Sequence, residues 1–279
     1  MAMAAALALA CVAGVARPVV AQDSAPRWFP HERLIPALLA PPREVGFRGS
    51  FVLADRDRSN DFPGRNIEAE VAIGHAFPVL RLSEGGPGAP MRASLDFEVG
   101  TFSRFFMESA RKDLINTDFR VGLPVSIVHG PWQVRLALRH ISSHFGDDFL
   151  TAFEQVLGQA SRDGFEAVVA HARGAGRLYA AGEYNFHRNA RVSRGDARLG
   201  AEWDGGRVDR SAPWFFAAAE GHYATLSDDV AATFVAGVGF EVNGRTVLLE
   251  ARAHVGPSPM GQLREVHESF FGLGMRIEP

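Results

Sequence analysis

The chain has 279 residues, of which 47% are hydrophobic and 22% charged, and its formal net charge is −3. This composition is typical of a folded protein and excludes wholesale disorder. The mild acidity argues against a nucleic-acid partner, which would require a basic surface patch. Beyond residue 21, no run of about 18 apolar residues could cross a bilayer as a helix.

The first residues, MAMAAALALACVAGVARPVVAQDS, form an apolar run that ends in Val-Val-Ala before Gln22. This pattern indicates a secretory signal peptide cleaved after Ala21, and the alternative is a hydrophobic tail that is retained. Cys11, the single cysteine, lies inside the predicted leader. We therefore expect a mature chain without disulfides or metal-binding thiolates.

The domain organisation follows from the next composition change. Residues 28–47, WFPHERLIPALLAPPREVGF, are rich in proline, and we expect them to lie outside the main fold. We therefore divide the chain into a signal peptide (1–21), a lead-in (22–45) and one further domain (46–279).

From Phe47 onward the dominant hydrophobic pattern has a period of two residues. Leu95, Phe97 and Val99, for example, alternate with Asp96 and Glu98. Such alternation predicts strands with one apolar and one polar face. We expect about twelve strands, near residues 47–57, 66–82, 92–105, 116–128, 132–146, 163–173, 176–187, 196–204, 212–226, 229–242, 245–255 and 269–278.

Alternation alone does not separate a soluble barrel from a membrane barrel, so the connections and the charges decide. Short turns, such as Asn243-Gly244, alternate with longer loops, which is typical of outer-membrane barrels. Against this, the chain ends in Arg-Ile-Glu-Pro and not in an aromatic residue. The polar faces also carry charges that suit a wet lumen better than a dry core, namely Asp96, Glu98, Arg120, Arg135, Arg139 and Glu241.

These observations together favour an all-β fold, an antiparallel up-and-down β-barrel of about twelve strands of the outer-membrane type, located in the cell outer membrane. A soluble β-barrel is the alternative. The expected partners are outer-membrane lipids or lipopolysaccharide. Arginine supplies all but one of the 29 basic residues, and it binds phosphate well, but a coding bias towards arginine is the preferred explanation of this excess. No cofactor motif was found, and the oligomeric state is not predicted.

Several segments of the chain resemble a known family. They are ERLIPALLAPPREVGFRGSF, DFRVGLPVSIVHGPWQVRLALRHISSHFGDDFL, HVGPSPMGQL and SFFGLGMRI. They look like the domain of unknown function 1207, a family of exported bacterial proteins, and the likeness is densest over residues 118–150. The resemblance implies a β protein of the bacterial envelope and implies no particular activity.

One predicted strand changes character along its length. In VRLALRHISSHFGDDF, residues 134–149, the even positions are apolar up to Leu138 and then become His140, Ser142 and His144. If the apolar even positions face lipid, these three polar side chains do so as well, at the level of the outer leaflet. A polar group exposed to hydrocarbon is expensive unless it serves a function there.

Two of these residues have the spacing of a nucleophile and its base. Residues i and i+2 of a strand share a face, with Cα atoms about 6.5–7 Å apart, so an imidazole can reach a hydroxyl. A His-x-Ser arrangement on the outside of a barrel is similar to that of outer-membrane phospholipase A and lipid A 3-O-deacylase, which cleave acyl esters. By this resemblance His140 is the base, Ser142 is the nucleophile, and an acidic or amide residue of the following strand orients the histidine.

The third member is predicted from the strand pairing. A loop centred near Phe153 places Glu166 opposite His140, and Glu166 shares its parity with the apolar residues Val168 and Ala170. Asp163 is the second choice, followed by Asp147 and Asp148. The asparagine that follows the serine in those enzyme families is absent, because Ser143 follows Ser142 directly, so the oxyanion stabiliser is not identified.

Other interpretations of these residues stay open. The strand could leave the membrane before His140, so that the polar residues decorate a wet rim. A metal site at His140, His144 and Asp147 or Asp148 requires the strand to end by Ile141, because histidines four apart on a strand are separated by about 13–14 Å. A second His-x-Ser pair, at residues 267 and 269, lies in polar surroundings and is treated as a chance match. The competing function is a non-enzymatic barrel that serves as a narrow pore, a lipid-binding protein or a structural protein.

Overall fold

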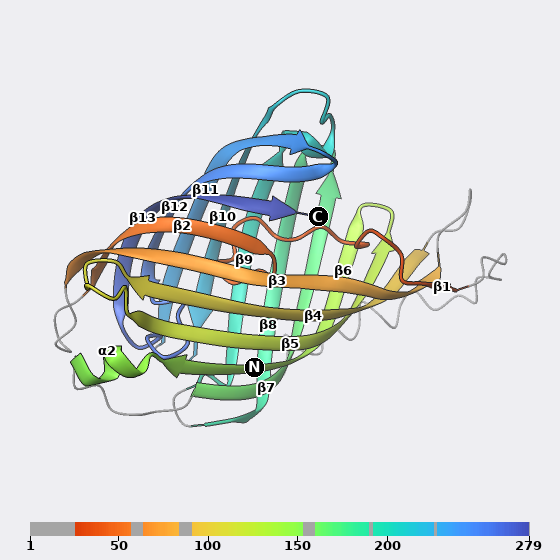
Figure 1. Ribbon diagram of the computed structural model, residues 1–279. Coiled ribbons are helices and arrows are strands. Elements are labelled where there is room, and N and C mark those ends of the chain that lie inside the picture. Colours follow the sequence, from red (N-terminus) through yellow and green to blue (C-terminus); the bar gives the residue numbers. More distant parts are fainter. Residues whose placement is uncertain are drawn as a thin grey trace.

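The computed structural model is an almost entirely antiparallel β structure (Figure 1), and it describes residues 26–56, 64–83, 91–152, 160–189, 192–225 and 228–278. The strands in these ranges are β1 (Arg27–Trp28), β2 (Phe47–Arg56), β3 (Arg65–Ser83), β4 (Met91–Phe106), β5 (Leu114–His129), β6 (Trp132–Phe145), β7 (Ala160–Arg173), β8 (Gly176–Arg188), β9 (Gly195–Asp204), β10 (Trp214–Ala224), β11 (Asp229–Val242), β12 (Arg245–Pro257) and β13 (His267–Glu278). The predicted signal peptide lies outside the described residues.

Strands β2 to β13 form a closed barrel in which each strand pairs with its neighbours in the sequence. The ring closes where β13 pairs with β2, from Glu268 opposite Arg56 to Ile277 opposite Phe47. The two-residue strand β1 adds to β3 outside this ring. The prediction of an antiparallel up-and-down barrel of about twelve strands is therefore confirmed.

The connections between the strands differ at the two ends of the barrel. The end that carries the C-terminus has tight turns, and in one of them Asn243 and Gly244 adopt positive φ angles of 52° and 74°. This backbone conformation suits a two-residue hairpin turn. The opposite end carries most of the longer connections, including the short helix α2 (Asp147–Ala152) and the segment between β12 and β13. The connection from β9 to β10, which contains the 3-10 helix Gly205–Arg207, lies at the C-terminal end. In the described part of the chain, no helix is long and apolar enough to cross a membrane.

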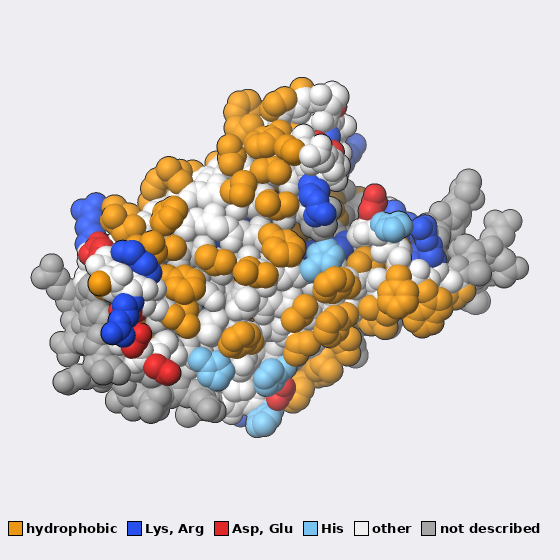
Figure 2. Space-filling view, viewed as in Figure 1, with side chains coloured by type: hydrophobic (Ala, Val, Ile, Leu, Met, Phe, Trp, Pro, Cys, Tyr) orange, Lys and Arg blue, Asp and Glu red, His pale blue; other side chains and the backbone are white. Residues whose placement is uncertain are grey.

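The alternation of the sequence matches the two faces of the barrel wall. Apolar residues predicted to share a face, such as Phe97, Val99 and Leu123, are exposed on the outside. Figure 2 shows hydrophobic side chains spread over the outer surface of the barrel. Of the six charges predicted to face the lumen, all but Glu241 are buried; Glu241 is exposed and pairs with Arg210.

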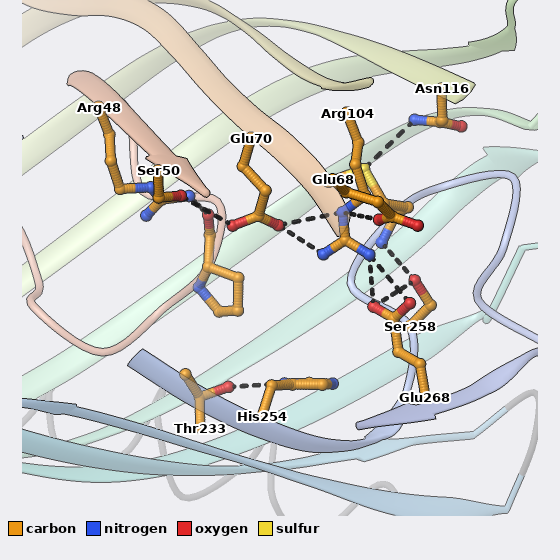
Figure 3. Close-up of polar contacts among 12 residues, drawn as sticks. Arg48, Ser50, Glu68, Glu70, Arg104, Asn116, Thr233, His254, Ser258 and Glu268 are labelled. Atoms are coloured by element: carbon orange, nitrogen blue, oxygen red, sulfur yellow. Dashed lines mark hydrogen bonds and ion pairs between the residues drawn. The ribbon is translucent and has the colours of Figure 1, made fainter. Parts of the chain in front are cut away.

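The lumen contains networks of arginine and glutamate. Arg104 lies at the centre of one of them: its Nη1 is 2.8 Å from Glu268 Oε1 and its Nη2 is 2.5 Å from Glu70 Oε1. Arg56 and Glu68 join the same network. Figure 3 shows Glu68, Glu70 and Glu268 converging on Arg104. Buried charges of this kind are tolerated because each is paired and hydrogen-bonded.

The proline-rich lead-in does not lie outside the main fold, so that prediction is wrong. Leu38, Leu39 and Ala40 are buried inside the barrel, and the backbone of this segment is tied to the wall. Arg276 donates to the carbonyl oxygens of Leu38 and Leu39 at 3.1 and 2.8 Å, and Glu202 accepts the N–H of Leu39 at 2.6 Å. The charged lumen thus supplies the partners that this irregular backbone needs.

The shape of the wall also accommodates the lead-in. Val45 packs against Gly74 and Gly100 on the adjacent strands β3 and β4, where a side chain on Gly74 would clash with backbone atoms at 2.6 Å. Leu38 packs in an apolar patch of the lumen with Val168 and Ala170. Small and apolar luminal residues therefore mark the path of the lead-in.

The segment between β12 and β13 fills the other end of the lumen. The N–H groups of Gly261 and Gln262 donate to Asp118 and Asn116 of β5, at 3.3 and 3.2 Å. Met260 is buried in a cluster with Ile115. The lead-in and this segment thus form two luminal plugs, one at each end of the barrel.

Replacement of Arg104 by alanine is expected to lower the free energy of unfolding by about 3–5 kcal/mol, because three buried carboxylates lose a partner. Unfolding by urea in detergent measures the change. Arg111→Ala is the control: Arg111 is exposed and lies 3.7 Å from an exposed Asp148, so its removal should leave stability unchanged. Equal stability of the two variants would contradict a structural role for the luminal network.

The lead-in is expected to close the barrel to ions. The wild-type protein should show little conductance in planar lipid bilayers, and deletion of residues 34–40 should raise it. Folding of the deletion variant is checked by heat-modifiable migration on gels. An equal conductance of the two folded proteins would show that the lead-in does not obstruct the lumen.

Candidate functional site

Strand β6 carries the predicted site on its outer face. Its even-numbered residues point outward and its odd-numbered residues are buried in the lumen, as Arg139, Ile141 and Ser143 are. His140, with 46% of its side chain exposed, therefore lies outside, on the same face as Ser142. The strand continues to Phe145, well past Ile141, so His140 and His144 are kept apart as strand residues.

The structure pairs His140 with Asp163, the second choice of the sequence analysis. The two residues are direct neighbours across β6 and β7, and His140 Nδ1 lies 2.7 Å from Asp163 Oδ1. The other carboxylate oxygen of Asp163 lies 3.1 Å from Nδ1 of His187 on β8. In Figure 2, histidines gather near an acidic side chain on the outer surface around this part of the barrel.

His187 is a member of this cluster that sequence reasoning missed. Asp163 pairs with His187, but the next residue, Gly164, pairs with Asn185, so β8 contains a bulge at Phe186. The bulge places Phe186 and His187 both on the outside, against the alternation of the strand. No signal in the sequence marks this irregularity, although bulges are common beside functional sites.

Ser142 has a different hydrogen-bond partner from the one expected. Its Oγ lies 3.3 Å from Nε2 of His144, two residues further along the same face. His144 in turn contacts the ring edge of Phe119. Ser142 therefore lies between two imidazoles, of which His140 is oriented by a carboxylate.

Glu166 is not opposite His140, and its predicted place in the site needs correction. Residue 166 pairs with Ala137, and the Glu166 side chain is 3% exposed inside the lumen, with ion pairs to Arg139 and Arg198. The pairing of β6 with β7 is shifted by three residues from the predicted one, and an odd shift reverses the face. Phe153, the predicted centre of the loop, lies outside the described residues.

The reversal has a physical cause in the lead-in. The apolar character of Val168 and Ala170 predicts a lipid-facing row, but in the structure both residues are buried against Leu38 in the lumen. The outward row of β7 contains Phe165 and Val169 in their place. Because the lead-in packs against β7 inside the barrel, both faces of β7 carry apolar residues.

The site lies among exposed apolar side chains. Ser142 pairs with Phe119 and His140 with Val121 across β5, and both apolar partners are exposed. Phe165 is exposed two residues beyond Asp163 on the same face of β7. Exposed apolar side chains therefore border the polar cluster.

The second His-x-Ser pair also has a carboxylate but a different geometry. His267 Nε2 lies 2.5 Å from Asp229 Oδ2, so the ring nitrogen that would serve a serine is already bonded. His267 and Asp229 are the first residues of β13 and β11, at the very ends of these strands. In His140 the carboxylate is bonded to Nδ1, which leaves Nε2 for a hydroxyl.

The chain belongs to the DUF1207 family, whose model, described as a protein of unknown function, matches residues 9–278. No curated protein sequence matches it significantly. Among solved structures, it resembles outer membrane phospholipase A from Escherichia coli with a TM-score of 0.61 at 12% identity, over 84% of this chain and 90% of that chain. An active-site mutant of the same protein gives 0.60 at 12% identity, over 89% and 95%.

A calcium-bound dimer of the Salmonella typhi phospholipase has a TM-score of 0.60 at 12% identity, over 84% of this chain and 90% of that chain. At such low identity these likenesses show the fold, a barrel of the kind found in outer-membrane proteins. In the described ranges of this chain, no group of three or more His, Cys, Asp or Glu side chains could hold a metal ion.

The outward position of Ser142 can be tested with cysteine labelling in a background without Cys11. Ser142→Cys is expected to react with a lipid-soluble maleimide in proteoliposomes. Ser143→Cys is the matched control, because Ser143 is 1% exposed in the lumen and should react far more slowly. Preferential labelling at position 143 would show that the faces of β6 are reversed.

Proposed function

We propose that the outer face of the barrel carries a serine hydrolase site that cleaves acyl esters of outer-membrane lipids. Ser142 is the nucleophile, His140 the general base, and Asp163 replaces Glu166 as the residue that orients the histidine. The observation that carries the proposal is the 2.7 Å contact of His140 Nδ1 with Asp163 on the lipid-facing side, two residues from Ser142.

The reaction follows from these positions. Ser142 Oγ attacks the ester carbonyl carbon while His140 Nε2 takes its proton, which gives a tetrahedral oxyanion and an imidazolium beside Asp163. Collapse of this intermediate breaks the bond to the alcohol oxygen, which receives the proton from His140. Water then attacks the acyl-serine with the same base, releasing a fatty acid and regenerating Ser142.

His144 has a second role in this scheme. In the structure it is bonded to Ser142 Oγ, so a rotation of the serine side chain about χ1 must bring the hydroxyl to His140. This rotation leaves the Nε2–H of His144 beside the reacting carbon, where it can donate to the oxyanion. Stabilisation of the developing charge by such a donor is a major part of catalysis by hydrolases.

The location of the site supports the choice of substrate. The exposed apolar surroundings of the cluster suit acyl chains, and the similar solved structures are named as phospholipases of the outer membrane. We infer that the chain is exported by a signal peptide cleaved after Ala21 and is located in the cell outer membrane. Its substrates are then phospholipids or lipopolysaccharide of the outer leaflet.

A non-enzymatic envelope barrel is the second candidate. The hydrogen bond of Ser142 to His144, and the sharing of Asp163 between two imidazoles, favour this alternative because neither is needed for hydrolysis. Among its forms, an open pore is disfavoured by the two luminal plugs. A barrel that binds lipid at the polar cluster without cleaving it is the remaining form.

Fatty acid release from phospholipid and lipopolysaccharide in mixed micelles tests the hydrolase. Ser142→Ala is expected to lower the rate by at least about 1000-fold, and Asp163→Ala by about 100-fold or more, because the nucleophile and the orientation of its base are lost. Ser161→Ala is the matched control: Ser161 of β7 pairs with Ser142 of β6, and the loss of its hydroxyl should leave the rate unchanged.

Further variants identify the base and the site. A stronger loss in His140→Ala than in His144→Ala supports the assignment of the base, and the reverse would assign it to His144. Loss of activity in Ser269→Ala with full activity in Ser142→Ala would transfer the site to the other His-x-Ser pair. Absence of hydrolysis by the folded wild-type protein on both lipids would leave the non-enzymatic barrel.

A further inference from the structure

A cavity in the lumen lies behind the wall that carries the candidate site. Its volume is about 110 Å³, and it reaches the end of the barrel that carries the segment between β12 and β13. Its lining comes from the lead-in, from β5 to β12, and from the segment between β12 and β13. Figure 3 shows two of its lining residues, Thr233 and His254, bonded to each other.

Four arginines of this lining have donors that no protein group uses. Among the described residues, Arg120 has no ion pair or hydrogen bond, and it lies 5.2 Å from the ring of Phe102. Arg264 donates its Nε to a carbonyl oxygen and has no ion pair in the same ranges. Arg43 has two buried nitrogens without a partner, and Arg162 has one.

The arginines also lie close enough to affect one another. Burial, together with the charges of Arg264, Arg162 and Arg120, lowers the pKa of Arg43 well below its ordinary value. A guanidinium group in such surroundings gains from a nearby anion. The chain itself supplies one carboxylate to Arg43, that of Asp118.

The acidic residues of the cavity are largely engaged elsewhere. Glu166 pairs with Arg139 and Arg198, and Glu183 accepts the Nε of Arg162. Asp196 differs from them: one of its carboxylate oxygens is buried without a hydrogen bond, and its nearest ion-pair partner is His222 at 3.8 Å. The cavity therefore offers spare donors from arginine and, at Asp196, a buried carboxylate oxygen that accepts no hydrogen bond.

We propose that this cavity binds a protonated phosphate, either inorganic phosphate or a phosphate monoester. Arg43, Arg120, Arg162 and Arg264 donate to its oxygens, and Asp196 accepts the hydrogen bond of its P–OH group. Guanidinium groups match the geometry of phosphate oxygens, and a bound anion favours their charged form. The site is independent of the proposed hydrolase, which acts on the opposite face of the wall.

The carboxylate of Asp196 lets the site select among anions. At neutral pH phosphate keeps a proton that Asp196 can accept, whereas sulfate has none and would place its oxygens against an unprotonated carboxylate. A phosphodiester headgroup likewise lacks the proton. The site therefore prefers inorganic phosphate, and the monoanion of a phosphate monoester, to sulfate and to diesters, since an unpaired buried charge is costly.

Isothermal titration of the folded, detergent-solubilised protein with sodium phosphate, glycerol 3-phosphate and sodium sulfate at constant ionic strength tests the proposal. We expect saturable phosphate binding that weakens by about tenfold or more in Arg120→Gln and in Arg264→Gln. Arg111→Gln, at an exposed arginine of the same end, is the matched control and should bind as the wild type does. Asp196→Asn should reduce the preference for phosphate over sulfate.

The source of the phosphate is separated by a further arm with phosphatidic acid and phosphatidylglycerol in mixed micelles. Binding of the soluble monoester supports a water-borne ligand, and binding of phosphatidic acid alone would assign the site to a lipid headgroup. Phosphate should also raise the thermal unfolding midpoint of the wild-type protein, a measurement that needs no variant. No such stabilisation, or equal binding by all arginine variants, would overturn the proposal.

Discussion

The alternation of side chains between the two faces of each strand is the constraint on which this structure depends. A closed barrel with an apolar outer surface must place its charges inside, where there is little bulk water to solvate them. The charges therefore have to pair, and the luminal networks around Arg104 and Glu166 are the result. The same constraint makes any polar group on the outside, such as His140, an exception that needs an explanation.

The filling of the lumen follows from the size of the ring. Twelve strands enclose more space than the side chains of the wall occupy, and the remaining space is taken by the lead-in and by the segment between β12 and β13. Their irregular backbones need hydrogen-bond partners, which Arg276 and Asp118 supply. Charges that the outer surface excludes thus serve to bind the plugs inside.

The strands and their faces could be predicted from the sequence because period two is a direct property of the pleat. Leu95, Phe97 and Val99 needed no knowledge of the rest of the fold to be placed outside. The lead-in could not be placed in this way, since a proline-rich segment has no periodicity, and its docking depends on luminal residues from several strands. Because Val168 and Ala170 pack against Leu38 of the lead-in, their apolar character predicted the wrong face of β7.

The candidate site could likewise be predicted only in part from the sequence. His140 and Ser142 follow from the parity of one strand, but Asp163 depends on the register between two strands and His187 on a bulge in a third. Strand register and bulges depend on how strands pair with one another, which a single sequence does not display. Because neighbouring residues of β6 and β7 point to opposite faces, the outer cluster and the luminal cavity share one wall: Asp163 faces outward while Arg162 faces the cavity. A change in register would exchange the two environments, so the luminal ion pair of Arg139 with Glu166, which joins β6 to β7, helps to keep the outer histidine and carboxylate in contact.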